Sequence, residues 1–202
     1  MTEKPDHYFA ELPKSEAKLG MVHTRLRGER FKFLTASSVF SKKQVDPGTR
    51  LLIEAMQLPE TGNVLDVGCG YGAVGIAAAA SNPRLRVVMT DVNSRAVHLT
   101  RQNIKINNVH NAEVRNGCLY NPIKDLTFMC ILSNPPVSAG METVKELITR
   151  APQVMMAEAT FQMVIRSKIG AKTLPFVFKE AFGNFSVLER KSGSRVLLAK
   201  KS

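Results

Sequence analysis

A chain of 202 residues, of which 44% are hydrophobic and 22% charged, can bury a sizeable core and has the usual length of one domain. The formal net charge of +11 favours a polyanionic partner such as nucleic acid, although a lysine-rich solvated surface has the same charge. The amino terminus lacks the pattern of a secretory leader and no apolar run is long enough to cross a bilayer, so no membrane partner is expected.

The cysteines Cys69, Cys118 and Cys130 are odd in number and widely spaced. This spacing is unlike that of a zinc site and argues against a disulfide framework. We therefore expect no metal and a reducing, cytoplasmic environment.

The first 45 residues are predicted to form an appendage that is either a short hairpin or a cap over a sheet. Alternating aromatic residues, Phe31 and Phe33, lie beside a basic cluster in this segment. The cluster comprises Arg25, Arg27, Arg30 and Lys32. Asp46 is a typical helix N-cap with Pro47 at the first helical position, so a helix is predicted through residue 56. We place the domain boundary here, with residues 1–45 as the appendage and 46–202 as the main domain.

From about residue 62, short β-rich runs alternate with helical patterns, which is typical of a parallel sheet with crossover helices. Strands are predicted at residues 63–67, 85–90, 112–116, 127–133 and 161–166. Helices are predicted at residues 73–80, 94–107, 141–150 and 169–182.

A glycine-rich turn follows the first of these strands, where Asp66 precedes Gly68, Cys69, Gly70 and Gly72. A strand, a glycine-rich turn and a helix N-terminus surround an anionic ligand group with backbone N–H groups. In S-adenosylmethionine that group is the methionine carboxylate, and Asp66 is expected to face the methionine amino group, directly or through water. Nicotinamide and flavin cofactors bind similar turns, so this motif alone leaves the cofactor open.

The second strand is followed by an acid, Asp91, and then Val92. A carboxylate at this position accepts both ribose hydroxyls of a nucleoside. Asp91 also suits the cap of the helix that begins at residue 94, which is compatible with ribose binding. The two motifs together favour a nucleoside cofactor.

The fourth strand ends abruptly in Asn134, Pro135 and Pro136. Because proline has no N–H and restricts the direction of the chain, the Asn134 side-chain oxygen and the Pro135 carbonyl remain free to accept hydrogen bonds. These acceptors match the two N–H donors of a planar amine and would orient its nitrogen for in-line displacement of a methyl group from a sulfonium. A tight strand-end turn explains an isolated motif of this kind, but not its place after the two earlier motifs.

Basic residues after the fifth strand, Arg166, Lys168 and Lys172, are predicted at the same edge of the sheet and are candidate phosphate contacts, with a solvated helix face as the alternative. Residues 184–190 and 195–200 are two β-type runs separated by a short turn, which predicts a terminal hairpin. A parallel sheet with this ending is the arrangement of class I methyltransferases, whereas the sheet of dehydrogenases stays parallel throughout.

The ordered motifs resemble those of amino-methyltransferases that carry an Asn/Asp-Pro-Pro-aromatic signature. They comprise Asp66 with its glycines, Asp91-Val92-Asn93, Asn103, Asn107-Asn108 and Asn134-Pro135-Pro136. From about residue 33 onward, the chain is most similar to the methyltransferase small-domain family, which includes bacterial small-subunit ribosomal RNA guanine-N2 methyltransferases. The resemblance implies a Rossmann-like α/β fold with a seven-stranded, mostly parallel sheet that ends in an antiparallel hairpin. Many such relatives carry a second, degenerate domain, whose docking role here would pass to the appendage or to a second subunit of a homodimer.

Two positions depart from the family pattern. Cys118 stands where an acid commonly contacts the adenine amino group, so backbone groups of Cys118 and Leu119 are expected to bind adenine, unless Cys118 is merely a small buried residue. Val137 stands where an aromatic ring would stack on a flipped base, a contact that contributes about 1–3 kcal/mol. Another aromatic residue would then supply the ring: Phe33, Phe40 or Tyr120.

The resemblance implies an S-adenosylmethionine-dependent N-methyltransferase that acts on an exocyclic amine of an RNA base, with guanine-N2 of rRNA or tRNA preferred. Asn134, Pro135 and Pro136 would be the catalytic clamp, with Asn134 also in contact with the cofactor. Val137 would lie with the basic residues against the substrate. A protein glutamine N-methyltransferase is the first alternative, because a side-chain amide presents the same planar nitrogen. A non-catalytic RNA-binding module is the second.

Overall fold

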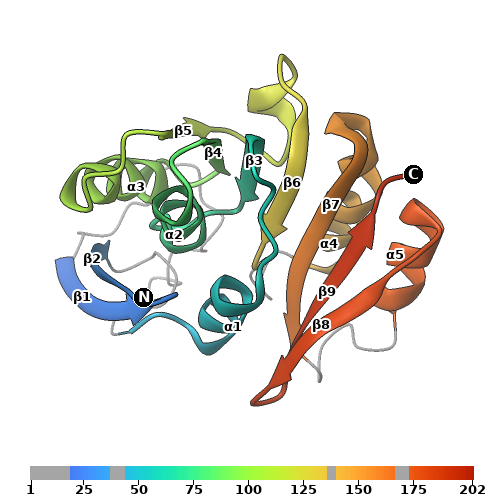
Figure 1. Cartoon of the computed structure of the whole chain (residues 1–202), viewed down its shortest axis with the longest axis horizontal. Coiled ribbons are helices and arrows are strands. Elements are labelled where there is room, and N and C mark those ends of the chain that lie inside the picture. Colours follow the sequence, from blue (N-terminus) through green and yellow to red (C-terminus); the bar gives the residue numbers. More distant parts are fainter. Residues whose placement is uncertain (1–18, 37–43, 136–139, 167–172) are drawn as a thin grey trace, which may run out of the picture.

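A seven-stranded sheet forms the centre of the computed structural model, and helices cover both of its faces (Figure 1). The structure describes residues 19–36, 44–135, 140–166 and 173–202. The strands lie in the order β5-β4-β3-β6-β7-β9-β8. Their bounds are β3 Gly62–Val67, β4 Leu85–Asp91, β5 Ala112–Asn116, β6 Phe128–Ser133, β7 Met155–Arg166, β8 Ser186–Lys191 and β9 Ser194–Lys200. Pairs from β5 to β7 are parallel, whereas β9 is antiparallel to β7 and β8, so the predicted sheet and its terminal hairpin are confirmed.

The helices divide between the two faces of the sheet because side chains alternate along each strand. Val64 packs with the first group of helices and Leu65 with the second. The first group is α1 (Pro47–Ala55), α2 (Ala73–Ser81) and α3 (Ser94–Ile106). The second is α4 (Met141–Arg150) and α5 (Leu174–Phe182), with the short 3₁₀ helices η1 (Asn121–Ile123) and η3 (Ala151–Val154). No helix in the described segments is long and apolar enough to cross a membrane.

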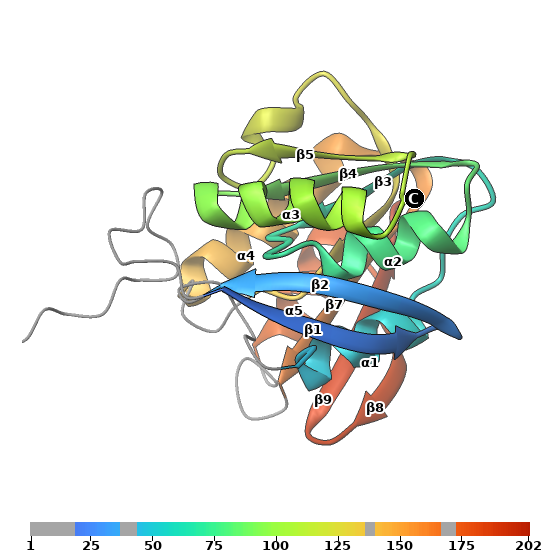
Figure 2. The same ribbon diagram turned by 90° about the vertical axis from the view of Figure 1, so that its left-hand side faces the viewer.

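The amino-terminal appendage contains an antiparallel hairpin of β1 (Leu19–Leu26) and β2 (Glu29–Ala36). Its two-residue turn, Arg27 and Gly28, has φ of +47° and +84°, as a type I′ turn requires. The hairpin runs beside α3 (Figure 2), and its buried Phe33 belongs to the same core as α1, α2 and α3. The hairpin therefore packs on the sheet's helical layer and not on the sheet itself.

Two element boundaries differ from the sequence prediction. β7 begins at Met155 and not at residue 161, because its first part pairs with the start of β6 across a bulge between Phe128 and Cys130. This part contains three consecutive exposed residues and hence no apolar alternation for a sequence pattern to detect. The last helix is described from Leu174, and the rest of its predicted span lies outside the described residues. The cap of α1 is confirmed, since Asp46 Oδ2 accepts the Thr49 N–H at 3.0 Å.

Candidate active site

The strands β3 and β6 are neighbours, but the chain leaves them toward opposite edges of the sheet. In open α/β sheets, a crevice at the carboxyl ends of such a strand pair is the usual ligand site. Two hollows meet there, a cleft of about 550 Å³ and a smaller one of about 380 Å³, and Gly68 lines both. The topology therefore places the motifs after β3, β4, β5 and β6 around one site.

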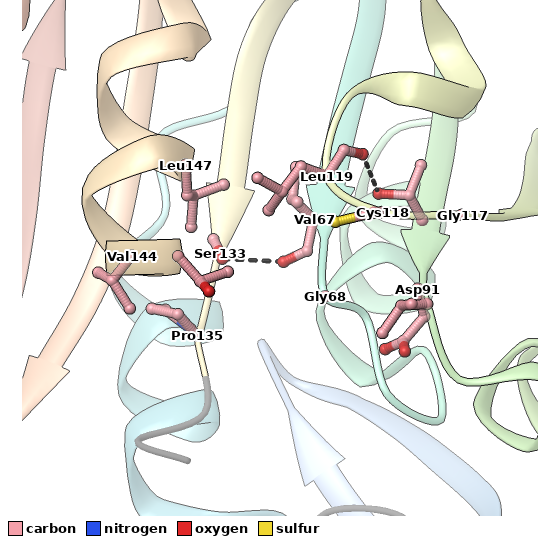
Figure 3. A pocket seen from close by; sticks show the side chains of 13 residues that line it. Val67, Gly68, Asp91, Gly117, Cys118, Leu119, Ser133, Pro135, Val144 and Leu147 are labelled. Carbon is pink, nitrogen blue, oxygen red and sulfur yellow. Dashed lines mark hydrogen bonds between the residues drawn. The ribbon is translucent and has the colours of Figure 1, made fainter. Parts of the chain in front are cut away.

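The larger cleft is a mostly apolar slot between α4 and the loops after β3, β4 and β5 (Figure 3). Val144 and Leu147 of α4 face Val67 and Leu119 across it. The other lining residues are Gly68, Thr90, Asp91, Val92, Gly117, Cys118, Ser133, Pro135 and Thr143. A slot with apolar walls and a carboxylate at its rim suits a flat base attached to a ribose.

Asp91 presents a carboxylate that is already anchored by the backbone. Its Oδ2 accepts the Gly70 N–H at 2.8 Å, and its Oδ1 accepts the Asn93 N–H at 2.9 Å. Burial raises the pKa of Asp91 to about 6, while these backbone donors act to lower it, so the group is largely ionised at neutral pH. With a third backbone donor, Val92, the carboxylate still retains acceptor capacity for a hydroxyl of the ligand. The geometry thus fits the predicted ribose role.

The backbone N–H groups of the glycine-rich turn are already hydrogen-bonded within the protein. The N–H groups of Gly68 and Cys69 both donate to Thr90 O, at 2.8 and 3.0 Å. The Gly72 N–H donates to Cys69 O at 2.9 Å, and the Gly70 N–H is taken by Asp91. These four N–H groups have acceptors within the protein, so the part of the predicted cradle that retains donors is the helix N-terminus.

The donors that remain at this end of the site belong to the first turn of α2. Ala73 and Val74 line the smaller hollow, and their N–H groups make no hydrogen bond within the described parts of the chain. A helix N-terminus attracts an anion through its unpaired N–H groups and its dipole. Gly72, at φ +92°, lies directly before this helix, and a Cβ there would meet Thr100 Cγ2 at 2.8 Å. These two N–H groups are thus the candidate donors to a carboxylate.

Asp66 lies in the same hollow and is almost fully buried. Its Oδ2 accepts the Gly75 N–H at 2.9 Å, whereas its Oδ1 has no hydrogen-bond partner among the described residues. Burial raises the pKa of Asp66 to about 7; the Gly75 bond acts to lower it and the charge of Asp91 raises it further. A buried carboxylate with one open oxygen favours a cationic ligand group, such as the predicted methionine ammonium.

Asn134 lies at the junction of the site with α1. Its Nδ2 donates to Thr49 Oγ1 at 2.8 Å and to Asp46 Oδ2 at 3.2 Å. Its Oδ1 makes no hydrogen bond within the described residues, as the predicted acceptor role requires. Next to it, Pro135 lines the larger cleft, so the clamp lies beside the cofactor slot.

Several predicted site residues have other surroundings than expected. Cys118 is exposed and lines the larger cleft, so it is not a small buried residue. Phe33 and Tyr120 are 0% and 2% exposed and cannot stack on a base. The prediction that either residue supplies the stacking ring is therefore wrong. Arg166 Nη2 pairs with Asp46 Oδ1 at 3.4 Å and keeps an exposed side chain. The remaining candidates lie outside the described residues: Phe40, Pro136, Val137, Lys168 and Lys172.

The sequence interpretation missed two groups of site residues. The wall formed by Val144 and Leu147 belongs to an apolar stripe of α4, and such a stripe signals burial without showing what it faces. Thr49 and Asp46 gave the signal of a helix cap, but their contact with Asn134 depends on packing between distant segments.

A parallel sheet with an antiparallel terminal hairpin, and a crevice that carries an acid after each of its first two central strands, together define the fold of the class I methyltransferases. The chain belongs to the methyltransferase small-domain family, whose model matches residues 30–198.

Relatives support this assignment over different lengths. The uncharacterized protein YbxB of Bacillus subtilis is 36% identical over 198 residues, covering 97% of this chain and 98% of YbxB. Ribosomal RNA small subunit methyltransferase C of Yersinia pestis is 31% identical over 170 residues, covering 82% of this chain. The chain matches only 47% of that enzyme's length.

A solved structure has the same fold. It is the T. thermophilus 16S rRNA N2 G1207 methyltransferase (RsmC) in complex with AdoMet and guanosine. The TM-score is 0.82 at 24% identity, with 94% of this chain and 52% of that chain covered.

Proposed function

We propose that this chain is an S-adenosylmethionine-dependent N-methyltransferase that acts on an exocyclic amine of an RNA base, with guanine-N2 of rRNA or tRNA preferred. The observation that carries the proposal is the orientation of Asn134. Both donor directions of its amide are directed at Thr49 and Asp46, and its oxygen is left as an acceptor. An acceptor at this place selects an N–H-bearing nucleophile.

The two hollows divide the cofactor between them. Asp66 Oδ1 and the N–H groups of Ala73 and Val74 would hold the ammonium and carboxylate of the methionine part. Asp91 would hold the ribose. The adenine ring would lie in the apolar slot against Val144, Leu147, Val92, Cys118 and Leu119. When bound, the cofactor supplies an electrophilic methyl group on a sulfonium.

The chain's own residues then orient the acceptor. Asn134 Oδ1 and the Pro135 carbonyl accept the two N–H bonds of the amine, which directs the nitrogen lone pair toward the methyl carbon. Transfer of the methyl group to this nitrogen would leave the cofactor as a neutral thioether, with the electron pair of the broken C–S bond on sulfur. The nitrogen becomes positively charged and acidic, so a proton passes from it to water without a dedicated base. Pro136 and Val137 would complete the wall around the base.

RNA is proposed as the substrate on charge, relatives and local geometry. The chain carries a net charge of +11, and relatives are named ribosomal RNA methyltransferases. Asp46 contacts both Asn134 of the clamp and Arg166. The Arg166 side chain is exposed, and its guanidinium is suited to bind a phosphate. Lys168 and Lys172 follow it in the sequence as further candidates.

We also propose residues 1–45 as an RNA-docking appendage of the domain formed by 46–202. Arg25, Arg30 and Lys32 are exposed on the hairpin and available for phosphate contacts. Arg27 is different, because its Nη1 donates to Ile53 O and Met56 O at the end of α1, at 3.0 and 3.1 Å. Arg27 therefore anchors the hairpin to the domain.

The decisive experiment transfers labelled methyl groups from S-adenosylmethionine to ribosomal subunits, rRNA and tRNA, followed by mass spectrometry of the nucleosides. We expect N2-methylguanosine in one RNA fraction and no labelled glutamine in protein fractions. A parallel comparison of nucleosides from cells with and without the gene identifies the site. Background transfer to every RNA, alongside tight cofactor binding, would contradict the proposed substrate.

A further inference from the structure

We propose that Asp46 and Thr49 are positioning residues that determine which way the Asn134 amide faces. The inference rests on the proposed function, because it concerns the amine clamp of that reaction. It goes beyond that function in assigning a task to the N-cap of α1 and to a residue of its first turn, neither of which is proposed to touch the reacting atoms. The observation is a closed set of hydrogen bonds among three buried or half-buried side chains.

The two atoms that surround the Asn134 NH₂ group differ in chemical character. Asp46 Oδ2 is a carboxylate oxygen and only accepts hydrogen bonds, and it already accepts the Thr49 N–H at 3.0 Å. Thr49 Oγ1 lies 2.8 Å from Asn134 Nδ2 and accepts in this arrangement. Asp46 and Thr49 are each 7% exposed, so water does not replace either partner easily.

An asparagine amide has little intrinsic preference between its two flipped orientations, because its oxygen and nitrogen ends are nearly the same size and rotation about its last torsion is broad. Flipped, Asn134 would direct its oxygen at the Asp46 carboxylate and its two N–H donors at the site. Donors there would oppose the N–H bonds of an amine and could not orient its lone pair. Because Asp46 only accepts hydrogen bonds, it favours the orientation in which the Asn134 NH₂ group faces Asp46 and the Asn134 oxygen faces the site. This is the orientation that the proposed reaction requires.

The same network connects the clamp to the substrate side. Arg166 Nη2 lies 3.4 Å from the other oxygen of Asp46, and the Arg166 side chain is 56% exposed. This ion pair places an exposed cation next to a site that is proposed to take a polyanion. Asp46 thus joins the helix cap, the clamp and the exposed cation through one carboxylate.

The test uses matched substitutions in the full chain. Thr49→Val removes the hydroxyl but keeps the size and the backbone N–H of the cap, whereas Thr49→Ser keeps the hydroxyl. Asp46→Asn keeps a good N-cap and introduces a donor that tolerates the flipped amide. We expect kcat to fall at least tenfold in Thr49→Val and in Asp46→Asn, with the Kd for S-adenosylmethionine within twofold of the original. Thr49→Ser should restore most of the lost kcat.

A second measurement reports the orientation without turnover. The Asn134 side-chain NH₂ signals, assigned by their loss in Asn134→Asp, should exchange slowly with solvent in the unmodified protein and faster in Thr49→Val and Asp46→Asn. Equal exchange in all three proteins would overturn the positioning role, as would full kcat in Thr49→Val. If the unmodified protein methylates no RNA but this exchange pattern holds, the positioning geometry stands and the proposed function fails.

Discussion

The Asn103 side chain hydrogen-bonds both backbone groups of Leu34: its Oδ1 accepts the Leu34 N–H at 2.7 Å, and its Nδ2 donates to Leu34 O at 2.9 Å. One turn later on α3, Asn107 makes the same pair with Lys32, at 3.0 and 2.8 Å. Two asparagines thus give β2 the hydrogen bonds that a neighbouring strand would supply. Asn103 Nδ2 also donates to Tyr71 O, which connects the hairpin to the glycine-rich turn.

We expect Asn103→Ala to lower the free energy of unfolding by about 2–4 kcal/mol, because it leaves backbone groups of Leu34 and Tyr71 unpaired in a buried region. Asn107→Ala is the matched control, because its bonds to Lys32 are exposed and water can replace them, so about 1 kcal/mol is expected. Urea denaturation measures both. Equal losses would show that burial does not govern the docking of the hairpin.

Asn134→Ala removes the acceptor of the proposed clamp and should reduce kcat at least 100-fold, a loss of about 2.7 kcal/mol or more in transition-state stabilisation. The Kd for S-adenosylmethionine should change little, because Asn134 borders the smaller hollow but the charged groups of the methionine part are assigned to Asp66 and the N-terminus of α2. Single-turnover methylation and calorimetric titration separate the two effects. A large loss of cofactor affinity would assign Asn134 to cofactor binding instead.

The affinity for S-adenosylmethionine should rise with pH. Burial raises the pKa of Asp66 to about 7, so below that value the carboxyl is mostly protonated in the free protein and must ionise to meet the ligand's ammonium. A group with this pKa that is fully ionised in the complex gives about a tenfold gain between pH 6 and pH 8.

Titration calorimetry in buffers of different ionisation enthalpy should detect the proton released on binding. Asp66→Asn should bind more weakly and lose most of the pH dependence. An affinity that is flat from pH 6 to pH 8 in the unmodified protein would mean that Asp66 does not contact the cationic group.

Arg166→Gln should weaken RNA binding and reduce the slope of log Kd against log salt concentration by about one phosphate contact. Arg86→Gln provides the control, because Arg86 is similarly exposed, at 53% against 56% for Arg166, and also pairs with one acid, Glu113. Arg86 lies near the amino end of β4, at the opposite edge of the sheet. Filter binding at several salt concentrations compares the two. Equal slopes would place the RNA contacts elsewhere.

Cys118 should be the cysteine that reacts with a maleimide in the native protein, and S-adenosylmethionine should slow the reaction. Cys118 is exposed and lines the larger cleft. Cys69 and Cys130 are buried, and burial raises the pKa of both thiols, to about 12 for Cys130. Mass spectrometry of labelled peptides distinguishes the three. If Cys118 is labelled at the same rate with and without saturating cofactor, it does not contact the adenine of the bound cofactor.

Much of the fold follows from local chemistry in the sequence. The two β-type runs near the carboxyl terminus are joined by a turn too short for a crossover, so they had to pair antiparallel. Asp46 and Pro47 marked the start of α1 because an N-cap and a first-turn proline act within a few residues. Asp66, Asp91 and Asn134 each lie at or next to the end of a strand, and the parallel sheet brings such ends to one edge.

Tertiary packing decided which backbone N–H groups of the site remain free to bind a ligand. The sequence places glycines next to Asp66, but tertiary hydrogen bonds to Thr90 and Asp91 occupy the N–H groups of Gly68 and Gly70. The donors that remain are therefore those of the first turn of α2, the helix N-terminus of the predicted cradle.

Likewise, the sequence alone predicted Asn134 as an acceptor for an amine, yet it is silent on which end of the amide faces the site. Asp46 lies 88 positions away along the chain and Thr49 lies 85 away, and both reach Asn134 only because α1 packs against β7 and the terminal hairpin of the sheet. Types of residue and their order determined the class of chemistry, because strand ends and turns are local. The orientation of the clamp required the tertiary structure, because a hydrogen bond depends on where both partners lie in space.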